Sequence, residues 1–131
     1  MNIKSLVAIS MVASALIAGT ITNPTPIKNG INYDIADDNT QNYYTFTLSE
    51  NAGVMFTASN DSIRVIFYDT DYNDYYANGC GYYQDGNTFN CEFKKGTYKI
   101  QVMPNYSYNP KQFNLFSTKM SDYVAPECSS D

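Results

Sequence analysis

The sequence predicts an all-β protein, built as a single antiparallel β-sandwich of the jelly-roll or immunoglobulin-like kind. Three observations lead to this fold class. Short runs of residues alternate between apolar and polar side chains, which is the period of a half-buried strand. Clusters of Gly, Asn, Asp and Pro separate these runs at short intervals. Beyond the N-terminal segment no long stretch keeps a helical period, so two packed sheets are the expected way to bury the apolar faces.

The alternating runs define the expected strands. In the first run, Tyr44, Phe46 and Leu48 share one face. The run from Ile63 to Tyr68 is apolar on both faces except at one position, which is typical of a central strand. The expected strands cover residues 43–48, 54–58, 63–68, 88–93, 97–102 and 113–115, and the turns between them lie at 50–53, 69–73, 85–87, 94–96 and 104–110.

The N-terminal segment, residues 1–20, is predicted to be a cleavable signal peptide. One cation, Lys4, precedes an apolar run from Leu6 to Ala18, and small residues follow, which is the order of a secretory signal. The run is about 13 residues long, whereas a bilayer span takes roughly 20. The alternative is a retained N-terminal helix, as in pilin-like subunits. We therefore expect a secreted, extracellular or periplasmic protein with no stable membrane span after cleavage.

Three regions follow the predicted signal. Residues 21–32 contain two prolines and no clear period, so we expect an extended arm or linker. Residues 33–119 hold the alternating runs and form the expected sandwich domain. Residues 120–131 are mostly polar and are expected to form a flexible C-terminal tail.

Composition argues against several functional classes. The 131 residues include 13 Tyr but no His and no Trp. Without His the usual Ser-His and Cys-His nucleophilic mechanisms cannot operate, and we expect no enzymatic activity. The alternative is a hydrolase that uses a pair of carboxylates, although the Asp residues lie in expected turns, where Asp is common for backbone reasons. The net charge is −5, or 7 − 13 = −6 once Lys4 leaves with the signal. Because nucleic-acid binding needs clustered cations and the only basic pair is Lys94-Lys95, no nucleic-acid partner is expected.

The cysteines predict one disulfide. Cys80 and Cys91 flank a Gly-bearing turn, and a bridge between them closes a loop of about 12 residues. The chain-entropy model gives such a bridge about 3 kcal/mol of stabilisation. Export favours this oxidation. Cys128 is then left over near the tail, where it either links two chains or stays free.

One turn is a candidate calcium site. Asp69, Asp71, Asn73 and Asp74 place oxygen-bearing side chains at close spacing, as a hard cation needs. The spacing does not match an EF-hand, because Asp74 stands where that loop requires Gly. The alternative reading is a solvated turn, where Asp is common for backbone reasons. No other cofactor is expected, and a second acidic group lies at Asp34, Asp37 and Asp38.

The segment after the central strand is rich in tyrosine. Exposed aromatic rings stack on sugar rings or pack against a neighbouring protein. The alternative is that Tyr simply suits a half-buried pleated surface. The candidate ligand or interface residues are Tyr72, Tyr75, Tyr76, Tyr82 and Tyr83.

Three stretches carry a family resemblance. They are Asn42–Leu48 with Gly53-Val54, Val65–Asn73 and Gly96–Val102. They are similar to the opening aromatic strand, the central apolar strand and the Gly-Thr-Tyr strand of the bacterial pre-peptidase C-terminal domain, a secreted β-sandwich often appended to proteases. The likeness extends over roughly residues 31–119 and implies the same fold.

The chain departs from that family at one point. The family often has two Asp just before its central strand, and Ser62 and Arg64 stand in those places here. Any acidic or metal-binding role of those positions is therefore not carried over to this chain.

These observations favour a non-catalytic secreted β-sandwich that acts through its surface. The first hypothesis is a structural or adhesive protein, a self-assembling subunit of an extracellular filament or matrix, whose arm adds a strand to a neighbour. The alternative is a monomeric module that binds carbohydrate or another extracellular protein through its Tyr-rich loop. The expected partners are thus a second copy, another extracellular protein, or a carbohydrate.

Overall fold

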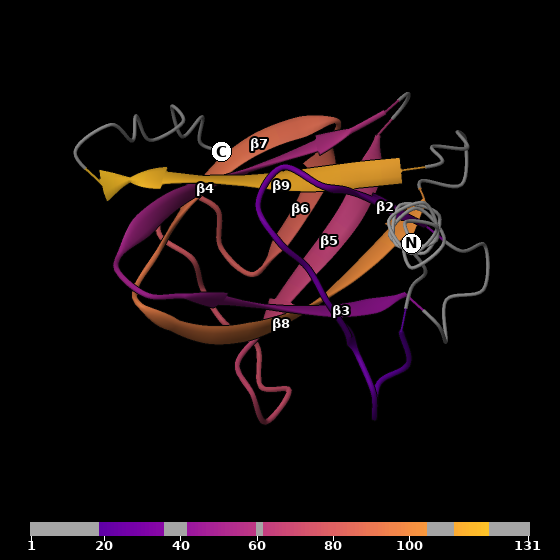
Figure 1. Ribbon diagram of the computed structural model, residues 1–131, viewed down its shortest axis with the longest axis horizontal. Helices are drawn as coiled ribbons and strands as arrows, with labels where there is room; N and C mark the ends of the chain where they lie inside the picture. The colour runs from indigo at the N-terminus through magenta and orange to yellow at the C-terminus, as the bar shows by residue number, and fades with distance from the viewer. Residues whose placement is uncertain (1–18, 36–41, 60–61, 105–111, 121–131) are drawn as a thin grey trace, which may run out of the picture.

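The structure, a computed structural model, describes residues 19–35, 42–59, 62–104 and 112–120. Within these residues the chain forms nine strands in two facing layers (Figure 1). The predicted β-sandwich is confirmed. The strands are β1 (Thr25–Pro26), β2 (Asn32–Asp34), β3 (Tyr43–Leu48), β4 (Ala52–Ala58), β5 (Ile63–Tyr68), β6 (Tyr83–Gly86), β7 (Thr88–Phe93), β8 (Gly96–Pro104) and β9 (Gln112–Lys119).

The strands divide into a five-stranded sheet A, in the order β1-β3-β8-β5-β6, and a four-stranded sheet B, in the order β2-β9-β4-β7, over the described residues. Neighbouring strands run antiparallel except at one edge, where β1 lies parallel to β3. The register of β3 on β8 pairs Tyr44 with Ile100 and Phe46 with Tyr98. Both pairs face inward, because alternate side chains of a strand point to the same side of its sheet.

The core between the sheets is dominated by aromatic rings. Phe56, Phe67 and Phe93 are fully buried, and burial of each such side chain contributes about 1.5–3 kcal/mol. The ring centroid of Phe93 lies 5.1 Å from that of Phe67 and 5.4 Å from that of Phe46, in both cases edge to face. This is the favourable geometry for aromatic pairs. The rings therefore join β7 of sheet B to β3 and β5 of sheet A.

The chain passes between the two sheets at short connections. A single residue, Asn87, separates β6 at the edge of sheet A from β7 at the edge of sheet B. Between β1 and β2 the turn contains Gly30 at φ 78°, in the left-handed region that favours glycine. The Gly30 N–H donates to the Leu115 carbonyl 2.7 Å away, which fixes this turn against β9.

The segment predicted as an extended arm lies on its own sandwich. Gly19 exchanges two backbone hydrogen bonds with Tyr43, of 3.1 and 3.0 Å. Further along, β1 pairs with β3, and the N–H of the buried Ile27 donates to the Thr45 carbonyl at 2.8 Å. The arm thus covers the edge of β3, together with Gly19 of the segment predicted as the signal peptide.

Several predictions fall outside the described residues. These are most of the signal peptide (1–18), the acidic positions Asp37 and Asp38, and the tail with Cys128. Within residues 19–35, 42–59, 62–104 and 112–120, the chain forms no helix with the length and apolar character of a membrane span.

Candidate functional site

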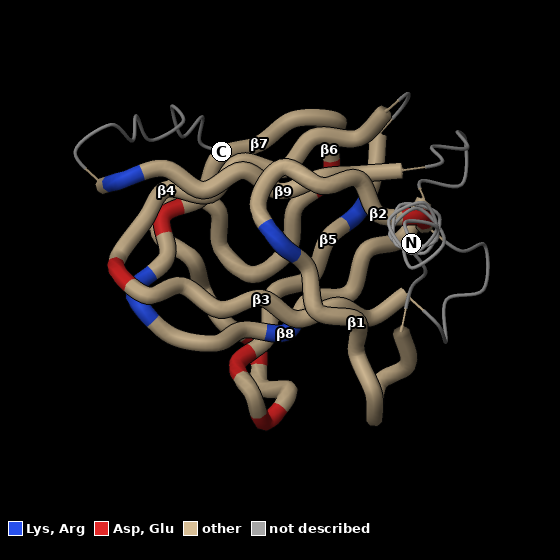
Figure 2. The backbone as a smooth tube through the Cα atoms, in the orientation of Figure 1, with Lys and Arg blue, Asp and Glu red and all other residues tan. Residues whose placement is uncertain are grey.

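Most of the candidate site residues lie in the connection between β5 and β6, residues 69–82. Its first part projects from the sandwich next to sheet A and carries a group of acidic residues (Figure 2). Its second part carries most of the candidate tyrosines. The two parts use their side chains in different ways.

The first part is a turn organised by one carboxylate. Asp69 Oδ1 accepts the backbone N–H groups of Asp71 at 2.8 Å and Asn73 at 3.0 Å. Asp69 Oδ2 accepts from the Asn73 side-chain amide at 3.3 Å. The backbone hydrogen bond from Asn73 is the main reason that the pKa of Asp69 lies below its ordinary value. The carboxylate thus satisfies backbone donors of its own turn.

The predicted calcium residues include three carboxylates, those of Asp69, Asp71 and Asp74. Among the described residues, no three Asp, Glu or Cys side chains come together as metal ligands. In the second acidic group, Asp34 accepts a 3.1 Å hydrogen bond from Gln112 Nε2, and its other members lie outside the described chain. The calcium hypothesis stays a prediction.

Tyr72 connects this turn to sheet A and to the N-terminal arm. Its φ of 64° is unusual for a bulky residue. Its ring meets those of Tyr43 and Tyr68 with centroids 5.9 and 5.3 Å apart, and Lys99 Nζ lies 4.4 Å from its centroid. Its hydroxyl donates to the Ile21 carbonyl at 2.5 Å. Burial, followed by the charge of Tyr43, raises the pKa of Tyr72. Tyr72 therefore joins the turn to the N-terminal arm.

Tyr75 is anchored in the sandwich. Its ring stacks on Phe93, with centroids 5.6 Å apart and planes inclined by 15°, and contacts Tyr98 at 4.7 Å. The Tyr75 and Tyr98 hydroxyl oxygens lie 3.5 Å apart, and Tyr98 also donates to the Lys94 carbonyl at 2.5 Å. Tyr75, predicted as an exposed ligand residue, is thus half-buried, because the end of the core offers it two aromatic partners.

Tyr76 and Tyr82 form an aromatic pair at the surface. Their ring centroids lie 5.2 Å apart in an edge-to-face arrangement. Tyr76 remains 66% exposed, so Tyr82 holds its ring while leaving it open to solvent. Tyr83, at the start of β6, is 42% exposed and belongs to the sheet rather than to this pair.

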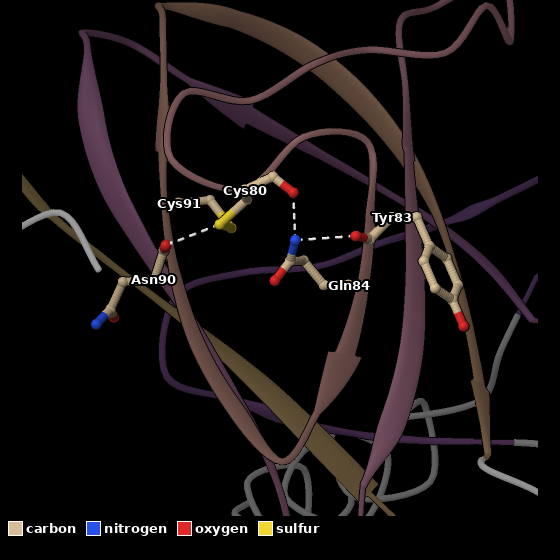
Figure 3. The surroundings of a disulfide bond; sticks show 5 residues. All are labelled: Cys80, Tyr83, Gln84, Asn90 and Cys91. Carbon is tan, nitrogen blue, oxygen red and sulfur yellow. Dashed lines mark hydrogen bonds between the residues drawn. A yellow bond between two sulfur atoms is a disulfide. The ribbon is translucent and has the colours of Figure 1, made fainter. Parts of the chain in front are cut away.

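The predicted disulfide between Cys80 and Cys91 is present, with Cα atoms 5.5 Å apart. It ties the tyrosine-bearing segment to β7, as Figure 3 shows. The Gln84 side-chain amide donates to the Cys80 carbonyl and, at 2.9 Å, to the Tyr83 carbonyl. Asn78 also pairs with Glu92 of β7 through two backbone hydrogen bonds, of 3.0 and 2.9 Å.

Where the segment meets β7, the surface forms a hollow of about 200 Å³. We call it the tyrosine hollow. Its walls combine aromatic rings, two side-chain amides, a carboxylate and an ammonium group. The lining residues are Asn51, Tyr75, Tyr76, Asn78, Glu92, Phe93, Lys94 and Met120.

The polar groups of the tyrosine hollow are held in place by the chain. Glu92 accepts a hydrogen bond from the Asn78 side-chain amide. Asn51 Oδ1 accepts the Lys95 backbone N–H at 2.8 Å, which fixes the amide at the rim. Hydrogen-bond donors and acceptors beside aromatic surface are suited to a ligand with both hydroxyl groups and apolar faces.

The sequence indicated only part of this hollow. Tyr75 and Tyr76 were among the predicted ligand residues, whereas Asn51, Glu92 and Met120 were not. These three come from a turn, from β7 and from the position just after β9, far apart along the chain. Glu92 appeared in the sequence only as an outward-facing position of an alternating run, which does not distinguish it from other surface residues.

A comparison of the chain with models of known protein families and with curated proteins finds no match. The resemblance to the pre-peptidase C-terminal domain therefore stays a prediction that rests on the three stretches quoted above.

Proposed function

We propose that the protein is an exported, non-catalytic adhesive module that binds carbohydrate through the tyrosine hollow. The observation that carries this proposal is the hollow itself, where the Tyr75 and Tyr76 rings lie beside the amides of Asn51 and Asn78 and the carboxylate of Glu92. A sugar ring has apolar C–H faces and hydroxyl groups at its edge. It matches a site that offers both an aromatic surface and hydrogen-bonding groups.

The size and the charge of the hollow limit the class of ligand that it can bind. The hollow measures about 200 Å³, below the roughly 300–1,000 Å³ of pockets that enclose drug-sized ligands. It therefore suits one sugar ring, such as the end of a chain, rather than an extended oligosaccharide. One carboxylate, Glu92, and one ammonium group, Lys94, line it, so its ionised groups balance. This balance favours a neutral sugar over a strongly acidic one.

The aromatic groups are arranged before a ligand arrives. Tyr75 is held between Phe93 and Tyr98, and Tyr76 is held by Tyr82. Binding then costs little side-chain entropy, which matters for a small ligand with few contacts.

The disulfide and the amino-acid composition agree with a binding role outside the cell. The disulfide is compatible with an oxidising extracellular or periplasmic environment. Because the chain has no His, a Ser-His or Cys-His nucleophile is excluded, and a binding role needs no such group.

Titration on an array of neutral and acidic glycans tests the proposal. We expect binding to neutral terminal sugars, and we expect Tyr76→Ala to weaken it about tenfold or more, since the exposed ring supplies the stacking surface. The matched control is Tyr83→Ala, which removes another exposed tyrosine outside the hollow and should bind like the unaltered protein. An array without binding, or equal losses in the two variants, contradicts the proposal.

A second candidate function, self-assembly, is favoured by the way the arm is held. β1 pairs with β3 through only Thr25 and Pro26, and in the parallel direction, which is slightly less stable per residue. We propose that residues 19–27 exchange between two copies, each placing Ile27 into the other's core.

The test is light scattering during size-exclusion chromatography over a range of concentrations. The chain with residues 19–27 should associate as its concentration rises, and a chain lacking them should not. A full-length protein that stays monomeric at millimolar concentration contradicts exchange.

A further inference from the structure

We infer that Cys80 and Cys91 are positioning residues for the tyrosine hollow, so that the protein reaches its full affinity for the sugar only after this disulfide has formed. The inference rests on the proposed carbohydrate site and adds a condition to it. The two walls of the hollow come from different parts of the chain. Tyr75, Tyr76 and Asn78 belong to the connection before β6, whereas Glu92, Phe93 and Lys94 belong to the end of β7.

The disulfide is the covalent link between these two walls. Cys80 lies two residues after Asn78, and Cys91 lies one residue before Glu92. In Figure 3 the bridge spans directly from the connection to β7, with Gln84 directed at the Cys80 carbonyl. The disulfide therefore fixes the spacing between the two walls at a point next to Asn78 and Glu92.

Without the bridge, two parts of the segment are held differently: the inner part at Tyr75, and the outer part that carries Tyr76 and Asn78. Tyr75 keeps its stacking on the buried Phe93, so the inner part stays in place. At the outer part, two backbone hydrogen bonds and one side-chain hydrogen bond join Asn78 to Glu92. Asn78 is exposed and Glu92 is only half-buried, so water competes for these bonds. The segment that carries Tyr76 and Asn78 is then free to leave β7.

Reduction is a balanced exchange with a dithiol. A thiolate of the reductant attacks the Cys80 sulfur, which is the more accessible of the two because Cys91 is fully buried. The bond between the two protein sulfurs breaks, Cys91 leaves as a thiolate and takes a proton, and a mixed disulfide forms at Cys80. The second thiol of the reductant then displaces Cys80, so the dithiol becomes a cyclic disulfide and the protein gains two thiols.

The consequence is a site that depends on the compartment. In a reducing compartment the outer wall is open for part of the time. The apparent affinity is then the affinity of the closed form multiplied by the fraction of molecules in which the wall is closed. Once the chain reaches an oxidising compartment, the bridge closes the wall and the site gains its full affinity. Export and binding competence are thereby coupled through one bond.

The experiment compares the oxidised protein, the same protein reduced with dithiothreitol, and the variant C80A/C91A. Two quantities are measured: hydrogen exchange at the Asn78 and Glu92 amides, and affinity for the neutral glycan identified on the array. We expect faster exchange at these two amides in both altered forms, with the Phe56 and Ile100 amides of the central strands unchanged. We also expect about tenfold weaker binding or more. The control variant Cys128→Ala should behave like the oxidised protein.

Exchange at the Phe56 and Ile100 amides separates positioning from general stabilisation, because a bridge that only stabilised the fold would slow exchange there as well. After removal of dithiothreitol, the reduced protein should regain both slow exchange and affinity, since its sheets never unfolded. If C80A/C91A does not fold, the reduced and reoxidised protein decides the question alone.

The two proposals fail in different ways. Equal affinity and equal exchange before and after reduction overturn the positioning role of the disulfide, whatever the ligand. Absence of glycan binding by the oxidised protein overturns the proposed function, and the exchange measurement still shows whether the bridge closes the wall.

Discussion

The two parts of the connection between β5 and β6 both carry tyrosine, but they use their side chains in opposite ways. Residues 69–74 hold a carboxylate and an aromatic ring that are both occupied by the chain itself: Asp69 caps its own turn, and Tyr72 binds the N-terminal arm. Residues 75–82 hold rings that pack against other aromatic side chains but stay partly exposed to solvent. Tyr76, for example, contacts Tyr82 and remains exposed. The presence of Tyr therefore does not by itself identify a binding site. What matters is whether neighbouring groups have already used those side chains.

The largest effect should follow from removing the support beneath the second part. Phe93→Ala deletes the ring on which Tyr75 stacks and leaves a cavity in the core, which costs about 3–5 kcal/mol of unfolding free energy. Urea denaturation measures this loss. Phe116→Ala serves as the matched control, because Phe116 is only half-buried on β9 and should cost clearly less. Equal costs would mean that Phe93 does not anchor the hollow.

A smaller effect should follow from loosening the first part. Tyr72→Phe keeps the ring contacts but removes the hydrogen bond to the Ile21 carbonyl, which is worth about 0.5–1.5 kcal/mol. Thermal unfolding should show this loss, and glycan binding should stay unchanged because Tyr72 does not line the hollow.

The control for stability is Tyr76→Phe. Because the Tyr76 ring is exposed, this variant should have a free energy of unfolding within about 0.5 kcal/mol of the original. A loss of binding in Tyr72→Phe would contradict the division between the two parts.

The smallest effect should appear as a pH dependence. The hydrogen bonds to Asp69 lower its pKa in the folded protein below the ordinary 3.8. Its contribution to stability is therefore complete above pH 3.8 and is lost as the pH falls through the lowered folded pKa. Asp69→Asn keeps an oxygen acceptor for the turn but carries no charge, so its unfolding free energy should fall less steeply in acid.

The control for this pH dependence is Asp71→Asn. Asp71 contributes its backbone N–H to the turn rather than its carboxylate, so this variant should keep the steeper acid dependence of the original protein. Identical acid profiles for the original protein and Asp69→Asn would contradict the capping role of Asp69.

The strands of six or more residues were foreseen from the sequence, at least in part, whereas the strands of two to four residues were not. The predicted runs correspond to β3, β4, β5, β7, β8 and β9. β4 begins at Ala52, β8 extends from Gly96 to Pro104, and β9, predicted only over residues 113–115, covers Gln112–Lys119. β1, β2 and β6 have two, three and four residues. A run so short shows no period of its own. These strands exist because a longer neighbour offers an unpaired edge, and that edge is visible only in the assembled sheet.

The sequence by itself determined the β-sandwich, the Cys80–Cys91 bridge and the expectation that a catalytic His is absent from any site. Each of these depends on local information: the period of apolar residues, the length of one loop, or composition. Only the tertiary structure decided that the arm covers β3 and that Tyr75 is half-buried. It also decided that Asn51, Asn78 and Glu92 meet beside Tyr76. These facts depend on which edges and ring faces remain unoccupied after the two sheets have packed, and no local pattern of residues records that.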